Sequence, residues 1–186
     1  MDAFSTPERL ALLLKRDFTF DETTWVQALL EEASTYLRSV IGQDVFPTTT
    51  STYTAYPSSG REDIPQYPVV SVDAVTRDDK AIAFTYRPGY ILVDCDEPCE
   101  VTFTWGYAAA PEELSRLACV LVSQALVTLE NNIGLTAGGL SSVALDDFKV
   151  AWADAGASSG MVLSEHAEAS VRKQFGRGNT LVAESR

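Results

Sequence analysis

The spacing of apolar residues in the first part of the chain predicts two helices, which together make up a segment of residues 1–44. In STPERLALLLKRDF, Thr6 and Pro7 are typical of an N-cap and a first helical position, and leucines follow on one face. A second helix is expected from a cap at Asp21 to a stop at Gly42. Its predicted apolar face consists of Trp25, Ala28, Leu29, Ala33, Tyr36, Leu37, Val40 and Ile41.

Residues 45–107 change to a hydrophobic period of two, which predicts strands. The stretches TTTSTYTAY, PVVSVDAV, AIAFTY, GYILVDC and CEVTFTWGY alternate and are rich in β-branched and aromatic residues. SSGRED is expected to be a loop, and TRDDK, RPG and DEP carry turn residues. Short strands at this spacing predict antiparallel hairpins, so this segment is interpreted as a β insertion, called the β unit below.

Residues 108–133 hold the strongest helical pattern of the chain, with Pro111 in the first turn. The expected apolar stripe consists of Leu114, Leu117, Ala118, Leu121, Val122, Ala125, Leu126 and Leu129. Cys119 and Val120 extend the apolar character, so we expect this helix to be buried on several sides.

The remaining residues, 134–186, have the composition of an extended arm. A strand is expected in VALDDFKVAWAD, with a turn or bulge at Asp146-Asp147, followed by the flexible stretch AGASSG. A short helix is expected from a Ser164 cap to a stop at Gly176, followed by a tail. The chain is therefore predicted to be α+β: a small helical bundle with an inserted antiparallel β unit and an extended C-terminal arm with a strand and a short helix.

Charge and length narrow the classes of function. The chain has 186 residues and a formal net charge of −12, which argues against a surface that grips nucleic acid but not against one past which DNA slides. No apolar run is long enough to span a bilayer. The amphipathic N-terminus opens with Asp2 rather than with basic residues, so we expect no signal peptide and a cytosolic origin with reduced thiols.

Cys95 and Cys99, in VDCDEPCEVTFTWGY, are the first candidate for chemistry. Structural zinc needs four ligands, and a thioredoxin-type pair needs C-x-x-C at the start of a helix. A hairpin with the three-residue loop DEP would instead place Cys95 opposite Cys99, with both side chains packed on the core side. Packing is the favoured interpretation, with a disulfide or a metal site as the alternatives.

Other catalytic signals are weak. The single histidine, His166, falls in a short helix that is expected to be exposed, and no nucleophile elbow surrounds it. The glycines form neither of the usual phosphate-binding loops, and the acidic clusters lack the calcium-loop spacing. We therefore predict a protein that is not an enzyme and that needs no cofactor and no metal.

Three stretches resemble the head–tail connector (adaptor) proteins of long-tailed bacteriophages, especially those of actinobacterial hosts. A strand that ends in TWGY, Thr104 to Tyr107, leads into a PEEL helix start, Pro111 to Leu114. A later segment, Ser141 to Asp154, has the pattern S…DFxVxWAD and precedes a short terminal helix. The likeness covers most of the chain, although the first forty residues match mainly in layout.

The resemblance implies a structural virion protein that forms a ring, commonly of twelve copies, between the capsid portal and the tail or next neck protein. DNA would pass through this ring without specific binding, and assembly would take place in the host cytoplasm, with no membrane involved. On this hypothesis the docking residues for the portal or a neighbour are Val171, Arg172, Lys173 and Phe175, although Val171 and Phe175 could instead pack on their own chain. Residues of the ring interface or the core are Trp25, Leu29, Leu117 and Leu121.

Two other functions stay open at this stage. One is a different neck component, such as a stopper or tail-completion protein. The other is a small hydrolase or a carbohydrate-binding module built on the β unit. The single histidine and the missing metal and nucleotide motifs weigh against hydrolysis, and the candidate aromatic residues for carbohydrate binding would be Tyr53, Tyr56, Tyr86 and Tyr90.

Overall fold

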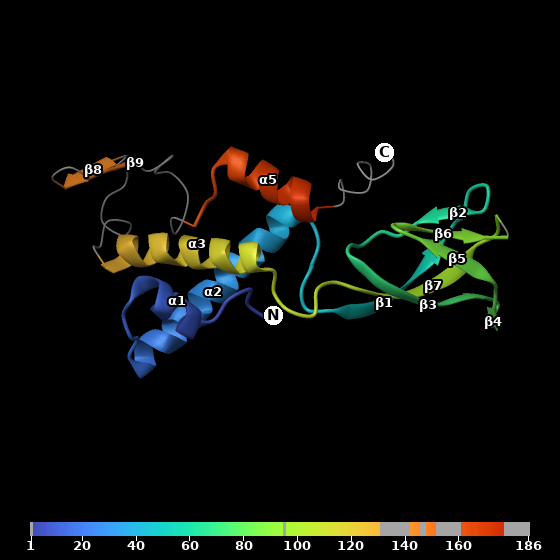
Figure 1. Cartoon of the computed structure of the whole chain (residues 1–186), viewed down its shortest axis with the longest axis horizontal. Helices are drawn as coiled ribbons and strands as arrows, with labels where there is room; N and C mark the ends of the chain where they lie inside the picture. The colour runs from blue at the N-terminus through green and yellow to red at the C-terminus, as the bar shows by residue number, and fades with distance from the viewer. Residues whose placement is uncertain (1, 95, 131–141, 146–147, 152–160, 177–186) are drawn as a thin grey trace. The chain divides into compact units, whose positions relative to one another are not determined.

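The computed structural model describes residues 2–94, 96–130, 142–145, 148–151 and 161–176 (Figure 1). The helices are α1 (Pro7–Leu14), α2 (Phe20–Ile41), α3 (Glu112–Glu130) and α5 (Glu165–Phe175). The strands are β1 (Thr49–Ala55), β2 (Arg61–Asp63), β3 (Val69–Arg77), β4 (Lys80–Ala81), β5 (Phe84–Arg87), β6 (Tyr90–Val93), β7 (Cys99–Trp105), β8 (Ser142–Leu145) and β9 (Phe148–Ala151). Helices and antiparallel sheets confirm the α+β class.

The chain divides into two compact units. The first contains the described residues of Ala3–Leu37 and Glu112–Ala169, and the second contains those of Arg38–Pro111 and Ser170–Arg186. The divisions fall within α2 and α5, so each of these helices contributes to both units.

The two N-terminal helices begin at capping motifs that are local in sequence. At α1 the Thr6 hydroxyl accepts a hydrogen bond from the Arg9 N–H and Pro7 follows, which confirms the predicted start. At α2 the cap is Thr19, because the Glu22 N–H donates to the Thr19 hydroxyl and the Thr19 N–H donates to the Glu22 carboxylate, 2.8 Å away. The predicted cap at Asp21 is therefore wrong, and Asp21 lies inside the first turn, where its charge favours the helix dipole.

Buried apolar side chains of α2 and α3 form most of the interior of the first unit. The members on α2 are Val26, Leu29, Leu30, Ala33 and Leu37, and those on α3 are Leu114, Ala118, Leu121, Val122, Ala125 and Leu126. The predicted face of α2 is rotated, because Val26 takes the buried position and Trp25 and Ala28 are exposed. On α3, Cys119 is buried as expected, but Val120 is exposed, so the prediction that it extends the buried face is wrong.

The β unit consists of two antiparallel sheets rather than one series of hairpins. Their strand orders are β1-β7-β3-β4 and β2-β6-β5. The stretch SSGRED, expected to be a loop, contributes β2, which pairs with β6. The predicted hairpin between β6 and β7 is also wrong, because β6 pairs with β2 and β5 while β7 pairs with β1 and β3. Strand partners here are set by contacts distant in sequence, which the short DEP connection does not reveal.

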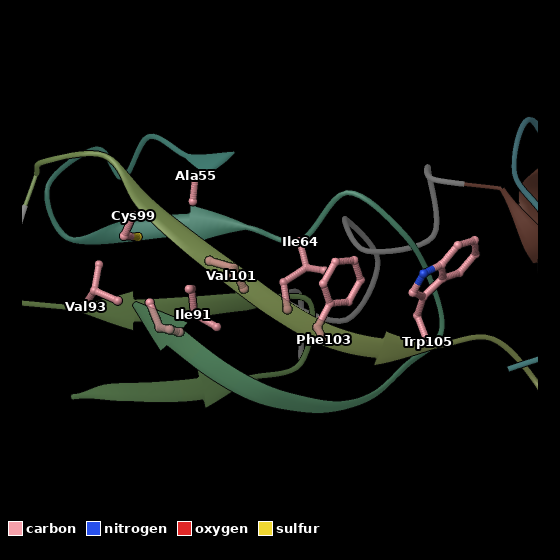
Figure 2. Packing of buried hydrophobic residues seen from close by; sticks show 9 residues of the cluster. Ala55, Ile64, Ile91, Val93, Cys99, Val101, Phe103 and Trp105 are labelled. Carbon is pink, nitrogen blue, oxygen red and sulfur yellow. The ribbon is translucent and has the colours of Figure 1, made fainter. Parts of the chain in front are cut away.

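The interior of the β unit is lined by alternate residues of its strands (Figure 2). Its buried members are Ala55, Ile64, Val75, Ile91, Val93, Cys99, Val101, Phe103 and Trp105. Cys99 lies opposite Ala55 and is 2% exposed, so it packs as a small apolar residue. Cys95 lies outside the described residues.

The C-terminal segment departs from the prediction in one respect. Instead of one strand, it contains β8 and β9, which pair antiparallel on either side of positions 146–147. The start of α5 is as predicted, since the Ser164 hydroxyl accepts a hydrogen bond from the Ala167 N–H, and the helix ends before Gly176. A Cβ at Gly176 would lie 2.4 Å from the Arg172 carbonyl oxygen, so close packing favours glycine there. Trp152 and the AGASSG stretch lie outside the described residues.

Candidate docking surfaces

The C-terminal half of α5 packs on its own chain within the second unit. Val171 and Phe175 are only 5% and 8% exposed. The Phe175 ring meets the Tyr107 ring edge to face, with 6.4 Å between the ring centroids. Val171 and Phe175, two of the four predicted docking residues, are therefore packed on their own chain, as the alternative interpretation expected.

Gln43 fixes this end of α5 and was not singled out by the sequence. Its side-chain N–H donates to the Phe175 carbonyl oxygen, 2.8 Å away, and its side-chain oxygen accepts from the Tyr67 N–H at 3.0 Å. The amide is buried and both of its ends have partners, which is the arrangement in which a buried polar group stabilises a fold. Because Gln43 and Phe175 are 132 positions apart, no local pattern could have indicated this contact.

Arg172 and Lys173 lie on the exposed side of the same helical turn. The Arg172 Nε donates to the Val40 carbonyl oxygen at 3.3 Å, and the residue as a whole is exposed. Both cations are in the last turn, where they favour the negative end of the helix dipole. The predicted docking set therefore splits into two buried apolar residues and two exposed basic residues.

The N-terminal half of α5 is held in the first unit by Tyr36. The Tyr36 hydroxyl donates to the Glu168 carboxylate at 2.5 Å and accepts from the Leu163 N–H at 3.1 Å. Burial raises the pKa of Tyr36, and the neighbouring Glu168 carboxylate raises it further, so the hydroxyl stays protonated and able to donate.

The predicted interface or core residues also separate by exposure. Leu29 and Leu121 are buried in the first unit, and Leu117 is half-buried. Trp25 is exposed, and large apolar side chains nearby in sequence are exposed as well. We call this set the N-terminal corner: Leu12, Leu13, Phe20 and Trp25, with exposed fractions of 79%, 55%, 86% and 39%.

The TWGY segment has a structural explanation in the second unit. Gly106 has φ +95°, and a Cβ there would lie 3.0 Å from the Pro47 carbonyl oxygen and 3.2 Å from that of Val45. The Trp105 indole N–H donates to the Ser51 hydroxyl at 3.0 Å, and the Tyr107 N–H donates to the Val45 oxygen at 2.8 Å. These residues therefore hold the turn that follows β7.

The chemistry of the described residues gives no catalytic constellation. Across the described ranges, no group of three or more His, Cys, Asp or Glu side chains is placed to hold a metal ion. Cys119 is buried with its sulfur 3.0 Å from the Ser5 hydroxyl, and burial raises the pKa of its thiol, which disfavours the reactive thiolate. His166 is exposed on α5, as predicted. In the same ranges, no helix combines the length and apolar character needed to cross a bilayer.

The four tyrosines considered for carbohydrate binding do not share one face. Tyr86 lies opposite the buried Ile91, so these two side chains share one face of the sheet. Tyr90 is the neighbour of Ile91 on β6 and therefore lies on the other face, where the Arg61 guanidinium is 4.0 Å from its ring centroid. Tyr53 is half-buried against Phe103, and Tyr56 is 70% exposed beyond the end of β1. An aromatic groove of the expected kind is therefore not formed by these four residues.

Comparisons with known proteins add little. No family model matches the chain, and no curated protein matches it. Among solved structures, a chain of the neck of an empty GTA particle, computed with C6 symmetry, is similar at 18% identity over 66% of this chain and 72% of that chain. The TM-score is 0.44, and a likeness at this level supports no conclusion on fold or function.

Proposed function

We propose that this chain is a structural assembly protein of a phage-like virion and has no catalytic role. It forms an oligomeric ring, of twelve copies, between the capsid portal and the tail or next neck protein. This proposal rests first on the resemblance of its TWGY, PEEL and DFxVxWAD stretches to head–tail connector proteins. One observation from the structure supports it most, the exposed apolar side chains of the N-terminal corner.

The N-terminal corner is suited to a subunit interface. Phe20 and Leu12 expose most of their surface near the junction of α1 and α2, whereas Leu10 of α1 and Val26, Leu29 and Leu30 of α2 are buried. Large apolar side chains that are left exposed commonly mark a surface that a partner covers, and the four residues of the N-terminal corner are neighbours in sequence. In a ring of identical subunits, one such surface meets a different surface of the next copy, and the interface closes on itself. We assign Trp25 and Phe20 to this interface, and Leu29 and Leu121 to the core.

The charge of the chain suits passage of DNA. At −12 per copy, a ring concentrates negative charge around its axis, and like charge keeps a phosphate backbone from adhering to the wall. DNA therefore passes without specific binding.

The portal contact is assigned to α5. Arg172 and Lys173 are exposed and positively charged on a chain that is otherwise acidic, while Val171 and Phe175 hold the helix in place. On this proposal the two basic residues contact the portal and the two apolar residues act only by positioning them.

The first experiment is electron microscopy of particles that contain the chain. A ring at the neck, touching the portal, is the expected result, and density at another position or with another symmetry would contradict the adaptor role and favour a stopper or tail-completion protein. For the purified chain, Phe20→Ser is expected to abolish ring formation in native mass spectrometry. Tyr56→Ser, which alters another exposed aromatic residue, is the matched control and should leave the ring intact.

The portal contact is tested separately by reversing charge. Arg172→Glu with Lys173→Glu should abolish co-sedimentation with the purified portal and leave the far-UV circular dichroism spectrum unchanged. Arg87→Glu, at an exposed position on β5, is the control. Undiminished portal binding by the double variant would contradict the assignment.

A further inference from the structure

Strand β1 forms one edge of the larger sheet. In the order β1-β7-β3-β4, β1 has β7 on one side, and no other strand of the described chain lies on the other. All seven residues of β1 pair with β7 in unbroken register, from Thr49 opposite Trp105 to Ala55 opposite Cys99. A regular edge strand presents a row of outward N–H and C=O groups that can receive a further strand.

The other edges of the β unit carry features that oppose strand addition, and β1 does not. β4 has two residues and begins with Lys80, and β2 consists of Arg61, Glu62 and Asp63. β5 has four residues and ends with Arg87. By contrast, β1 reads TTSTYTA, with no charged residue, proline or glycine. Because charge, shortness and proline are the usual protections of a sheet edge, β1 is the unprotected edge of this unit.

The solvent face of the sheet continues toward this edge as a row of hydroxyl groups. The Thr104 hydroxyl donates to the Asp73 carboxylate at 2.7 Å and lies 2.9 Å from the Thr50 hydroxyl. Thr52 and Thr102 make a second hydroxyl pair at 2.9 Å. Strand by strand, the row ends at the exposed Thr50 and Thr52 of β1, so a strand with Thr or Ser at alternate positions would extend it.

The core is also open on this side. On β7, Val101 and Phe103 are fully buried, whereas Ser51 and Tyr53, the inward-facing neighbours on β1, are only half-buried. An added strand would place its own inward side chains beside Ser51 and Tyr53 and cover them. Apolar, β-branched residues fit these positions because they pack well on a pleated surface.

Charge selects the kind of partner. Residues 45–107 contain nine Asp or Glu side chains and only four Lys or Arg side chains. A second copy that paired through its own β1 would bring the same local excess of acidic side chains to the contact, and these would repel. A segment whose flanks are basic would be attracted to the same region.

We propose that β1 accepts, as an added strand, an extended basic segment of another protein, with Thr or Ser alternating with apolar β-branched residues. In this mode, backbone hydrogen bonds supply affinity and the alternate side chains supply specificity. The proposal goes beyond the ring described above and does not depend on it.

The test uses the full-length chain and a peptide, acetyl-Lys-Thr-Val-Thr-Val-Thr-Val-Thr-Lys-amide. Calorimetry should show binding, and hydrogen exchange should show slowed exchange of backbone amides in β1. A peptide with Pro in place of the second and third Thr should not bind, because it lacks the N–H groups that pair. A peptide with Glu in place of both Lys should bind at least about tenfold more weakly.

Variants of the chain locate the contact. Thr52→Lys should weaken binding of the basic peptide and Thr52→Glu should strengthen it, while Thr85→Lys, at an exposed position on the other sheet, should have no effect. Absence of binding at millimolar peptide, protection away from β1, or equal affinities of the two Thr52 variants would each overturn the proposal. If a Thr52→Cys variant forms a disulfide with a second copy as readily as it captures a cysteine-bearing peptide, the occupant is the chain itself and the proposal is wrong.

Discussion

Replacing Phe175 with Ala tests whether the end of α5 is a structural anchor or a docking group. The Phe175 residue is 8% exposed, and its ring meets the Tyr107 ring edge to face. The Phe175 carbonyl oxygen accepts a hydrogen bond from the Gln43 side chain. Truncation of a buried Phe costs about 3–5 kcal/mol. Because Phe175 is the last residue of its helix, the surroundings can relax, so we expect the low end, a loss of about 3 kcal/mol in the free energy of unfolding.

The assay combines urea unfolding, followed by far-UV circular dichroism, with hydrogen exchange of the α5 amides. The second measurement is needed because the chain has two compact units, and these need not unfold in one transition. Lys173→Ala is the matched control, since it changes an exposed residue on the same helical turn. It should alter stability by less than about 0.5 kcal/mol.

The two possible roles of Phe175 give different results. An anchor loses stability and exchange protection when it is truncated, and portal binding falls only to the extent that the helix detaches. A docking group loses portal binding at unchanged stability. If Phe175→Ala unfolds within about 0.5 kcal/mol of the unaltered chain, the buried position of this ring is wrong.

Three further predictions concern the β unit. Tyr53→Phe should raise the free energy of unfolding by about 1 kcal/mol in urea titrations, because the buried Tyr53 hydroxyl has no hydrogen-bond partner within the described residues, while Tyr86→Phe, at an exposed ring, should change little. Gly106→Ala should lower the free energy of unfolding by about 2 kcal/mol or more, through backbone strain and the contact of the added Cβ with Pro47. Gly42 has φ +80° but no atom within 4 Å of an added Cβ, so Gly42→Ala should cost about 1 kcal/mol through strain alone. Equal losses for the two variants would refute the steric part of this explanation. Burial raises the pKa of Glu62, so its contribution to stability is fully present at acidic pH, below the ordinary glutamate pKa, and is lost as pH rises through the raised pKa. Glu62→Gln should therefore stabilise the chain at neutral pH and have no effect at acidic pH, and a stabilisation independent of pH would contradict this.

The sequence predicted features whose causes are local. The Thr6 cap, the Ser164 cap and the stop at Gly42 each depend on residues within one helical turn, and all three are present. The start of α2 also has a local cause, because Thr19 and Glu22 form a capping box with the usual spacing, and this signal is stronger than the single carboxylate of Asp21. The rotation of the buried face of α2 follows from a similar ambiguity, since Trp25 and Val26 are adjacent apolar residues and only packing decides between them.

Features that depend on distant contacts could not be predicted in this way. The strands β6 and β7 are separated by a short connection that is typical of a hairpin, yet they belong to different sheets. The contact between Gln43 and Phe175 joins segments 132 positions apart, and the motif around Gly106 acquires its reason only when Pro47 is seen beside it. The strand partners and the position of α5 are therefore set by contacts between residues far apart in the sequence, which local patterns do not record.

The placement of the TWGY segment changes what the resemblance to connector proteins can mean. Gly106 is required by a positive φ and by the nearby carbonyl oxygens, and Trp105 and Tyr107 are held by Ser51 and Phe175. Each of these constraints preserves a turn and the position of α5, and each is made within the chain itself. A motif of this kind can therefore be shared by chains that have the same subunit fold and bind different neighbours. It follows that the identity of the partners must be decided by surfaces outside the motif. These are the N-terminal corner, the two basic residues of α5 and the edge strand β1. The Phe20→Ser, charge-reversal and strand-addition experiments test these surfaces one at a time.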